Sequence, residues 1–469
     1  MTTELQNRIE SGDLGFLDGL VLLGTIASQR WFGGKSRDVL DARVLDAGVV
    51  PGGPPILAFA IVEVRYGLQT HELYHLPLGF RPSDDGWEQQ SVVAETEGWI
   101  AYDALADSEL VRRIVELVRA GEPLDLGEAT IVFNGSDALP GKIETVRPMG
   151  AEQSNSSLVL DERLALKLYR RIEPGMNPEL ELLRFLTDRG FPHAAALEGF
   201  ISYEGRPLEA TLAILQRFVP SRGDAWELAL ETLGSDPGWL PAHARRLGEV
   251  TGALHNALGS DPTDPHFAPE EPSTESLALL SASIDEEIEQ VFAALPEIEA
   301  LEPVAGRAEE VRDRLRTLTH IGQVGRVIRH HGDYHLGQAL WTNEEDWLIL
   351  DFEGEPARSL AERRRKRSPL RDVAGMLRSF AYAASASVIQ RGVEPPEGWE
   401  EECRSEFLAG YLGEIEPALL PSGEQGIKRL LMIFELEKAV YELRYELANR
   451  PDWVSIPVAG IQRMLEADA

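Results

Sequence analysis

Three side chains with oxygen ligands lie close together in the stretch HHGDYHLGQALWTNEEDWLILDFEGEP, which runs from His330 to Pro356. Asp333 follows a strand-like segment on a predicted loop, where a carboxylate can accept the proton of a hydroxyl group. Gln338 comes next with a neutral amide oxygen, and Asp351 follows the apolar run WLIL with a charged oxygen. Mg²⁺ prefers such hard oxygen ligands together with substrate phosphates. The order of base, ligand and ligand predicts phosphoryl transfer to a hydroxyl group.

A lysine for the phosphates is available upstream. Lys167 is the one charged residue in the apolar run LALKLY, and a buried lysine is costly unless it is paired. Its expected partner lies on the following helix, where we favour Glu181 and keep Glu179 as the alternative. A lysine and glutamate pair of this kind positions nucleotide phosphates in kinases.

A polar loop precedes this strand in the run EQSNSS, which contains Ser154, Asn155 and Ser156. Its backbone N–H groups and hydroxyls can close over phosphates. The loop lacks a glycine-rich pattern, so on its own it is weak evidence for a nucleotide site.

The charge of the chain excludes some classes of partner. The chain has 469 residues, of which 43% are hydrophobic and 26% are charged, as in ordinary soluble proteins with two or three domains. Its formal net charge of -33 repels polyanions, so we expect no nucleic-acid partner. The cationic run Arg363 to Arg367 is therefore interpreted as a local brace or a phosphate-facing loop.

Targeting and redox signals are absent from the sequence. The opening MTTELQNRIESGDLGF has no basic start followed by an apolar block, and no apolar run approaches the roughly 20 residues that span a bilayer. Cys403 is the only cysteine, which excludes an internal disulfide and a cysteine-based zinc site. We expect a cytoplasmic protein with no membrane partner, as a monomer or a weak dimer.

The pattern of elements predicts an α+β fold in three regions without an internal repeat. Residues 1–90 are predicted to form a small β-rich unit, and residues 91–220 to form a small antiparallel sheet with one inserted helix. Residues 221–469 are mostly helical, and the stretch that carries Asp333 is the strand-bearing exception.

The second region can be divided further. We predict a strand to Pro148, a polar loop over 150–157, a hairpin that turns at Asp161 and Glu162, and a strand that ends near Tyr169. A helix is expected to start at Asn177, with Pro178 in its first position. Two further strands are predicted in the runs ALEGFISYEG and EATLAILQRFV, before a break at VPSRGD.

These motifs lead to a family resemblance. HGDYHLGQ and DFEGEP, with LALKLYRR upstream and SPLRDVAGMLRSFAYAA downstream, resemble the aminoglycoside-phosphotransferase branch of the protein-kinase-like fold. Within that branch, four features resemble the bacterial maltokinase family: WFGGK, EPGMNPELEL, the run from DFEGEP to GMLRSF, and ELEKAVYELRYELANRPDW. Gln338 replaces the asparagine of most kinases but matches the maltokinase pattern.

The resemblance implies a bilobal enzyme with an amino-terminal cap that transfers phosphate from ATP, with Mg²⁺, to the anomeric hydroxyl of maltose. The product would be maltose 1-phosphate for α-glucan (glycogen-like) synthesis, and a trehalose-converting enzyme is a possible partner. In this family pattern Asp333 resembles the catalytic base, Gln338 and Asp351 the magnesium ligands, and Lys167 with Glu181 the phosphate-positioning pair. Asp372 resembles the aspartate that braces the catalytic loop. The adenine hinge resembles residues 216–219, which include Gln216, Phe218 and Val219.

The sugar site is the part that the sequence defines least. Aromatic faces, carboxylates and amides commonly hold sugars, and the candidates beside the expected cleft are His335, Glu353, Glu355, Tyr441, Tyr445 and Trp453. Tyr441 and Tyr445 share a helix face, which could equally be core. Trp31 to Lys35 could be a structural turn or could act near the nucleotide loop.

Three rival functions stay open. A kinase for a cationic acceptor, such as glucosamine or an aminoglycoside, would need a cluster of carboxylates in the acceptor pocket, whereas a neutral disaccharide would need hydrogen bonding and stacking. A non-catalytic nucleotide-binding scaffold would be expected to lack the base, the lysine or a metal ligand. A metallophosphoesterase, suggested by GDYH, would need a matching Asp-x-His or Gly-Asn-His segment that the sequence lacks.

Overall fold

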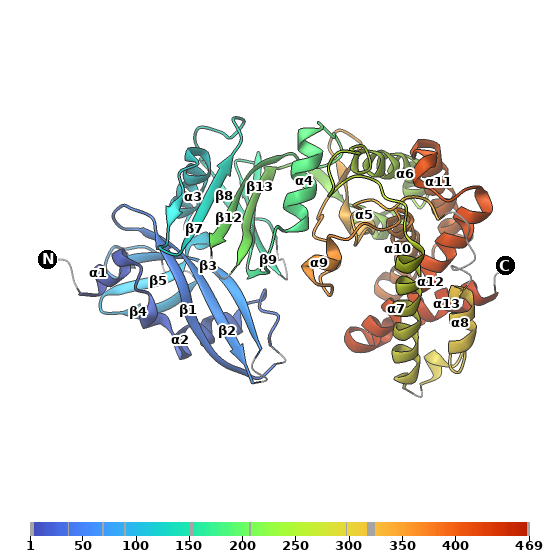
Figure 1. The fold of residues 1–469 in the computed structure, drawn as a ribbon, viewed down its shortest axis with the longest axis horizontal. Helices are drawn as coiled ribbons and strands as arrows, with labels where there is room; N and C mark the ends of the chain where they lie inside the picture. The colour runs from blue at the N-terminus through green and yellow to red at the C-terminus, as the bar shows by residue number, and fades with distance from the viewer. Residues whose placement is uncertain are drawn as a thin grey trace. The chain divides into compact units, whose positions relative to one another are not determined.

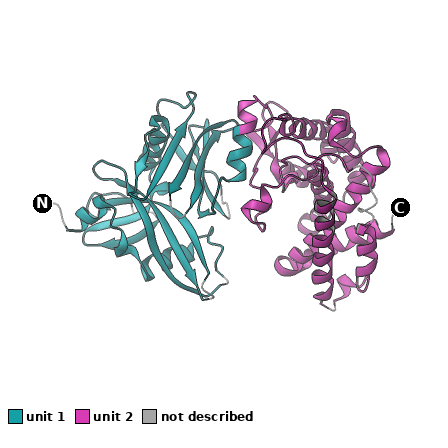
Figure 2. Ribbon diagram, in the orientation of Figure 1, with its two compact units in different colours: residues 1–184, 195–219 teal, residues 185–194, 220–469 magenta. Residues whose placement is uncertain are grey.

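The computed structural model describes residues 4–35, 37–67, 70–88, 91–150, 154–205, 208–296, 298–316 and 324–466. The chain forms two compact units (Figure 2): unit 1 comprises Met1–Arg184 and Ala195–Val219, and unit 2 comprises Phe185–Ala194 and Pro220–Ala469. No helix within the described ranges is both long and apolar enough to cross a membrane.

Unit 1 begins with a sheet that has the strand order β1-β2-β3-β5-β4 (Figure 1). These strands are antiparallel neighbours and have the following bounds: β1 Val39–Val49, β2 Ile56–Tyr66, β3 His71–Pro82, β4 Val92–Thr96 and β5 Trp99–Asp103. Two helices, α1 (Glu4–Ser11) and α2 (Leu20–Ser28), precede the sheet. The sheet therefore runs past residue 90, where the sequence analysis ended the first region.

Strand β2 shows why this sheet is buried on both faces. Successive side chains of a strand point to opposite faces, and almost every residue of ILAFAIVEVRY is buried. Leu57, Phe59 and Ile61 belong to one apolar core, which they share with helix α3 (Ser108–Ala120) and with the second sheet. Ile56 and the β2 residues that point to the same face as Ile56 belong to another core, which they share with α1 and α2.

The second sheet of unit 1 has the order β6-β7-β12-β13-β10-β9-β8. Its strands are β6 Leu124–Asp125, β7 Ala129–Gly135, β8 Val146–Pro148, β9 Asn155–Leu160, β10 Leu164–Tyr169, β12 Leu197–Gly205 and β13 Glu209–Arg217. The short β11 (Arg171–Ile172) pairs with β3 of the first sheet. The predicted hairpin is confirmed, because β9 and β10 pair across Asp161 and Glu162, whose φ angles are +52° and +51° as a type I′ turn requires.

Helix α4 (Pro178–Asp188) is also confirmed at its predicted start. The side chain of Asn177 accepts the backbone N–H of Glu179 at 2.8 Å, as an N-cap does. The predicted polar loop is shorter than expected, because β9 already begins at Asn155; its residues 151–153 lie outside the described ranges.

Unit 2 is mainly helical, as predicted (Figure 1). It also contains a small sheet in the order β14-β15-β16. These strands are β14 Ser221–Asp224, β15 Ala339–Thr342 and β16 Trp347–Ile349. The helices are α5 Ala225–Leu233, α6 Trp239–Leu258, α7 Thr274–Ala293, α8 Ala308–Arg316, α9 Leu360–Arg363, α10 Leu370–Arg391, α11 Trp399–Glu414, α12 Glu424–Asn449 and α13 Ser455–Glu466. The loop that carries Asp333 leads into β15, and Asp351 follows β16, so the small sheet positions both carboxylates.

Candidate active site

Asp372 at the start of α10 holds the loop before Asp333. Its carboxylate accepts the backbone N–H groups of His331 at 2.8 Å and Gly332 at 2.9 Å, and it lies 3.1 Å from Nε2 of His255 on α6. Burial raises the pKa of Asp372, but the neighbouring His330 and His255 lower it by more, so the carboxyl stays ionised. This contact pattern matches the bracing role that the sequence analysis gave to Asp372.

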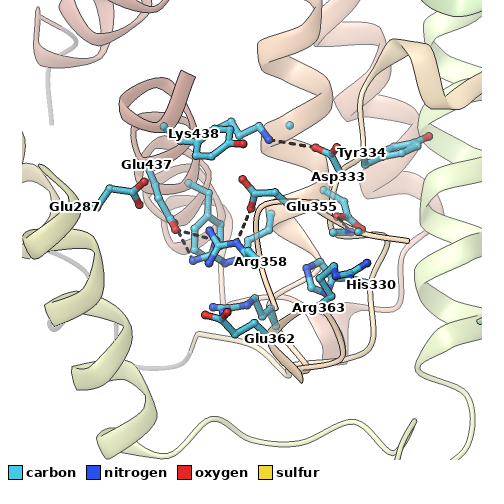
Figure 3. Close-up of a pocket in the computed structure, with 18 residues that line it drawn as sticks. Glu287, His330, Asp333, Tyr334, Glu355, Arg358, Glu362, Arg363, Glu437 and Lys438 are labelled. Carbon is cyan, nitrogen blue, oxygen red and sulfur yellow. Dashed lines mark hydrogen bonds and ion pairs between the residues drawn. The ribbon is translucent and has the colours of Figure 1, made fainter. Parts of the chain in front are cut away.

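The carboxylate of Asp333 points into a cavity of about 70 Å³ (Figure 3). Its side chain is 26% exposed, and Oδ1 lies 3.4 Å from Nζ of Lys438 on α12. Burial lowers the pKa of Lys438, but the carboxylates of Asp333 and Glu355 raise it by more, so the lysine is a cation. The sequence analysis missed Lys438, although it is the only lysine of the run ELEKAVYELRYE.

Gln338 and Asp351 lie side by side, as two ligands of one ion must. Nε2 of Gln338 donates to Oδ2 of Asp351 at 3.1 Å, which leaves the amide oxygen of Gln338 available to a cation. Asp351 has φ +58°, a left-handed conformation that is uncommon outside glycine and that often marks functional sites. This pair of oxygen ligands fits Mg²⁺, which would neutralise the charge of phosphate oxygens when bound.

In unit 1, Lys167 on β10 is paired with a glutamate at the start of α4. Nζ of Lys167 lies 2.7 Å from Oε2 of Glu179, and the Tyr169 hydroxyl donates to the same oxygen at 2.8 Å. Lys167 therefore contacts Glu179, which the sequence analysis kept as the alternative to Glu181. Residues two apart on a helix point about 200° away from each other, and the capped first turn directs Glu179 toward β10. Glu181 is also buried. Both glutamates lie in the first turn of the helix, so the sequence alone offers no way to choose between them.

Three candidates of the polar loop, Ser154, Asn155 and Ser156, lie at or next to the start of β9. Asn155 pairs with Tyr169 in β10 and is buried, whereas Ser154 is exposed. The hydroxyl of Ser156 accepts Nε of Arg170 at 2.8 Å, and Arg170 also pairs with Asp103 of β5 at 2.5 Å.

Arg170 gives the WFGGK segment a structural context. Its guanidinium lies 5.3 Å from the ring of Trp31, which is 8% exposed and packs on Tyr74. Trp31 therefore contacts the residue that binds Ser156, next to the polar loop. The sequence analysis missed Arg170; the signal was a second basic residue immediately after the LALKLY strand.

The predicted hinge lies where the chain leaves unit 1. Gln216 is the partner of Ala165 in β10, and the backbone N–H of Phe218 donates to the carbonyl of Arg163 at 2.8 Å. Val219 is the last residue of unit 1. The structure thus places the hinge candidates on the strand next to Lys167 and at the crossing between the units.

Two of the sugar candidates line the cavity beside Asp333, namely Glu355 and Tyr441. Glu355 is 8% exposed and pairs with Arg358 (Figure 3). Burial raises the pKa of Tyr441, and the charge of Glu355 adds to this rise, so the phenol keeps its proton and can donate a hydrogen bond.

The other four sugar candidates do not line this cavity. Trp453 is a correction, because it packs with Leu230, Ala386 and Ile456 in an apolar cluster. Tyr445 is 45% exposed and lies under Arg450. His335 uses Nδ1 to accept the N–H of Gly337 and so caps its own loop. The backbone carbonyl of Glu353 accepts Nη1 of Arg363.

Comparison with known proteins agrees with this geometry. Residues 145–406 match the phosphotransferase enzyme family, and residues 26–107 match the maltokinase N-terminal cap domain. Two curated relatives are glucosamine kinases, from Streptacidiphilus jiangxiensis and from Mycolicibacterium smegmatis (strain ATCC 700084 / mc(2)155). The first is 24% identical over 391 residues, which cover 80% of this chain and 85% of the relative. The second is 24% identical over 332 residues, which cover 68% and 79%.

A solved structure of a glucosamine kinase in complex with glucosamine, ADP and inorganic phosphate is 18% identical, with a TM-score of 0.69. The match covers 94% of this chain and 98% of that one, so the two share a fold. The predicted protein-kinase-like fold with an N-terminal cap is therefore confirmed. Because the family match spans more than half of its length, the chain belongs to the phosphotransferase enzyme family.

Proposed function

We propose that the protein is an ATP-dependent kinase that phosphorylates maltose at its anomeric hydroxyl and gives maltose 1-phosphate for α-glucan synthesis. The observation that carries this proposal is the match of residues 26–107 to the maltokinase N-terminal cap domain, on a chain whose residues 145–406 match the phosphotransferase enzyme family. The four local motifs that resemble maltokinases, from WFGGK to the PDW near the end, support the same assignment.

In this proposal, Asp333 accepts the proton of the sugar hydroxyl as the oxygen attacks the γ-phosphorus of ATP. Lys438 lies against the same carboxylate and holds it in place. Gln338 and Asp351 would hold Mg²⁺ on the phosphate oxygens. Lys167, fixed by Glu179, supplies a positive charge for the phosphates.

The charges around Asp333 favour a neutral acceptor. Three carboxylates that line the cavity of Asp333 each have a cationic partner. Asp333 pairs with Lys438, Glu355 with Arg358, and Glu437 with Arg371. A protonated amino sugar would compete with these cations for the carboxylates, whereas a neutral sugar needs only hydrogen bonds and a face such as that of Tyr441.

A second candidate is phosphorylation of glucosamine. It rests on the two curated relatives, which are glucosamine kinases at 24% identity. The two candidates predict different acceptors for the same catalytic groups, so one assay separates them.

The test measures ATP consumption with Mg²⁺ on maltose, glucose, glucosamine, trehalose and an aminoglycoside, and locates the new phosphate by phosphorus NMR. Maltose turnover to an anomeric phosphate is the expected result. Preference for glucosamine would overturn the acceptor assignment but keep the kinase. Absence of turnover on every acceptor would favour the nucleotide-binding scaffold.

A further inference from the structure

A second cavity, of about 450 Å³, lies in unit 2 next to the cavity of Asp333. The two cavities share Arg358, Arg367, Arg371 and Glu437 among their lining residues. The larger one is also lined by Ser368, which precedes helix α10. Its volume falls in the usual range of small-molecule sites, and none of the catalytic roles above uses it.

Arg367 is a cation whose backbone is bonded to Ile328 and whose side chain has no partner among the described residues. Its backbone N–H donates to the carbonyl of Ile328 at 2.9 Å, and its carbonyl accepts the N–H of Ile328 at 3.0 Å. Within the described ranges, its guanidinium makes no hydrogen bond or ion pair. Burial, followed by the charges of Arg371 and Arg358, lowers the pKa of Arg367 to about 10.

Ser368 adds a neutral donor beside this cation. It is 9% exposed, it lines the cavity, and its Oγ has no hydrogen-bond partner among the described residues. A buried hydroxyl without a partner is costly. Helix α10, which is 22 residues long, begins two residues later at Leu370, and the start of a helix carries a partial positive charge that favours anions.

Four of the five acidic residues that line the cavity have a partner in the part of the chain that the structure describes, and Glu271 is the exception. Glu437 is paired with Arg371 at 2.8 Å, Glu287 with Arg444 at 3.3 Å, and Glu270 with Lys366. The carboxylate of Glu362 accepts the backbone N–H and hydroxyl of Ser359. Arg367 lines the same cavity, and none of these four carboxylates neutralises its charge, so an anion in the cavity would do so.

We propose that this cavity binds the phosphate group of a small phosphorylated ligand through Arg367 and Ser368. A guanidinium and a hydroxyl provide several donors for the oxygens of a tetrahedral anion, and arginine matches phosphate well. The basic run, which the sequence suggested was a brace or a phosphate-facing loop, serves here as the wall of an anion site. The residues that line this cavity all belong to unit 2, whereas Lys167 belongs to unit 1. The proposal does not depend on which acceptor the enzyme phosphorylates.

Isothermal titration calorimetry of the full-length protein with inorganic phosphate tests the site. Nucleotide and Mg²⁺ are left out, and chloride keeps the ionic strength constant because screening weakens ionic contacts. Arg367→Gln is expected to weaken phosphate binding about tenfold or more, since it removes a charged donor. Ser368→Ala, which only removes a hydroxyl, is expected to weaken it to a smaller extent.

Two control variants separate this site from other anion sites. Lys167→Met removes the phosphate lysine of unit 1 and is expected to keep the binding. Arg391→Gln removes an exposed charge at the far end of α10 and is expected to change nothing. The proposal is overturned if wild type shows no saturable binding in the millimolar range, if R367Q and S368A bind like wild type, or if only K167M abolishes binding.

A second titration with a hexose monophosphate identifies the source of the phosphate. Tighter binding than inorganic phosphate, lost in R367Q, points to a phosphorylated sugar that also contacts the rest of the cavity. Equal binding of the two points to free phosphate. Binding of the sugar phosphate that R367Q leaves unchanged counts against the site.

Discussion

The carboxylate of Asp333 has one side-chain partner among the described residues, the ammonium of Lys438. Replacing Asp333 by Asn keeps the size and the hydrogen-bonding ability of the side chain but removes its capacity to take a proton. We expect D333N to fold and to bind ATP normally, with kcat lowered about 100-fold or more. Steady-state kinetics and nucleotide titration measure both effects, and appreciable residual kcat would contradict the assignment of the base.

Lys438 is a positioning residue in this arrangement, because it acts through Asp333. Lys438→Met removes the cation that holds the carboxylate, so we expect kcat to fall about tenfold while the KM for ATP changes little. Lys438→Arg, which keeps the charge, is expected to retain more of kcat than the methionine variant.

Lys428→Met provides the matched control for this change. Lys428 lies on the same helix, is 64% exposed and pairs with Glu424 on the surface. It should leave kcat unchanged. Equal losses in the K438M and K428M variants would show that the effect comes from the helix and not from the contact with Asp333.

At the scale of elements, the pairing of strand β10 with helix α4 decides which glutamate fixes Lys167. Glu179→Gln removes the charge that compensates a buried ammonium, so we expect kcat/KM for ATP to fall about tenfold. Glu181→Gln, made in the same helical turn, is expected to have the smaller effect. Measuring kcat/KM for both variants decides the matter, and a larger loss in E181Q would restore the choice that the sequence favoured.

Short-range patterns predicted the elements around these residues well. The turn at Asp161 and Glu162 and the helix start at Pro178 follow from local backbone preferences, and both are observed. The order of Asp333, Gln338 and Asp351 was likewise readable, because all three lie within one stretch of the chain.

Long-range packing is the part that the sequence could not supply. Trp453 resembles a sugar platform in sequence, yet it packs with Leu230 and Ala386, which are distant in the chain. Lys438 and Asp333 are separated by 105 positions, so nothing local connects them. The first sheet extends beyond residue 90 because β5 pairs with β3 and β4 pairs with β5, and local sequence patterns do not reveal these pairings.

At the scale of the whole molecule, buried histidines make the stability depend on pH. His75 on β3 is fully buried, its ring lies 5.9 Å from that of Phe59, and burial together with the charge of Arg170 lowers its pKa to about 3. An unfolded histidine has a pKa of about 6.5. Between these values the unfolded chain binds a proton that the folded chain does not. The stability from His75 is thus complete above about pH 6.5 and is lost as the pH falls toward 3.

This linkage gives a test that is independent of catalysis. His75→Leu removes the titrating group. When the pH is lowered from 7 to about 5, the wild type should therefore lose about 2 kcal/mol more of its unfolding free energy than H75L does. Denaturant unfolding at the two pH values measures it, and groups common to both proteins cancel. His71→Leu, at the exposed start of the same strand, should show no such shift. If the difference in unfolding free energy between wild type and H75L does not change with pH, folded His75 takes up a proton as readily as the unfolded chain does. That result would contradict the prediction, because burial beneath Phe59 and the nearby Arg170 cation oppose protonation of His75.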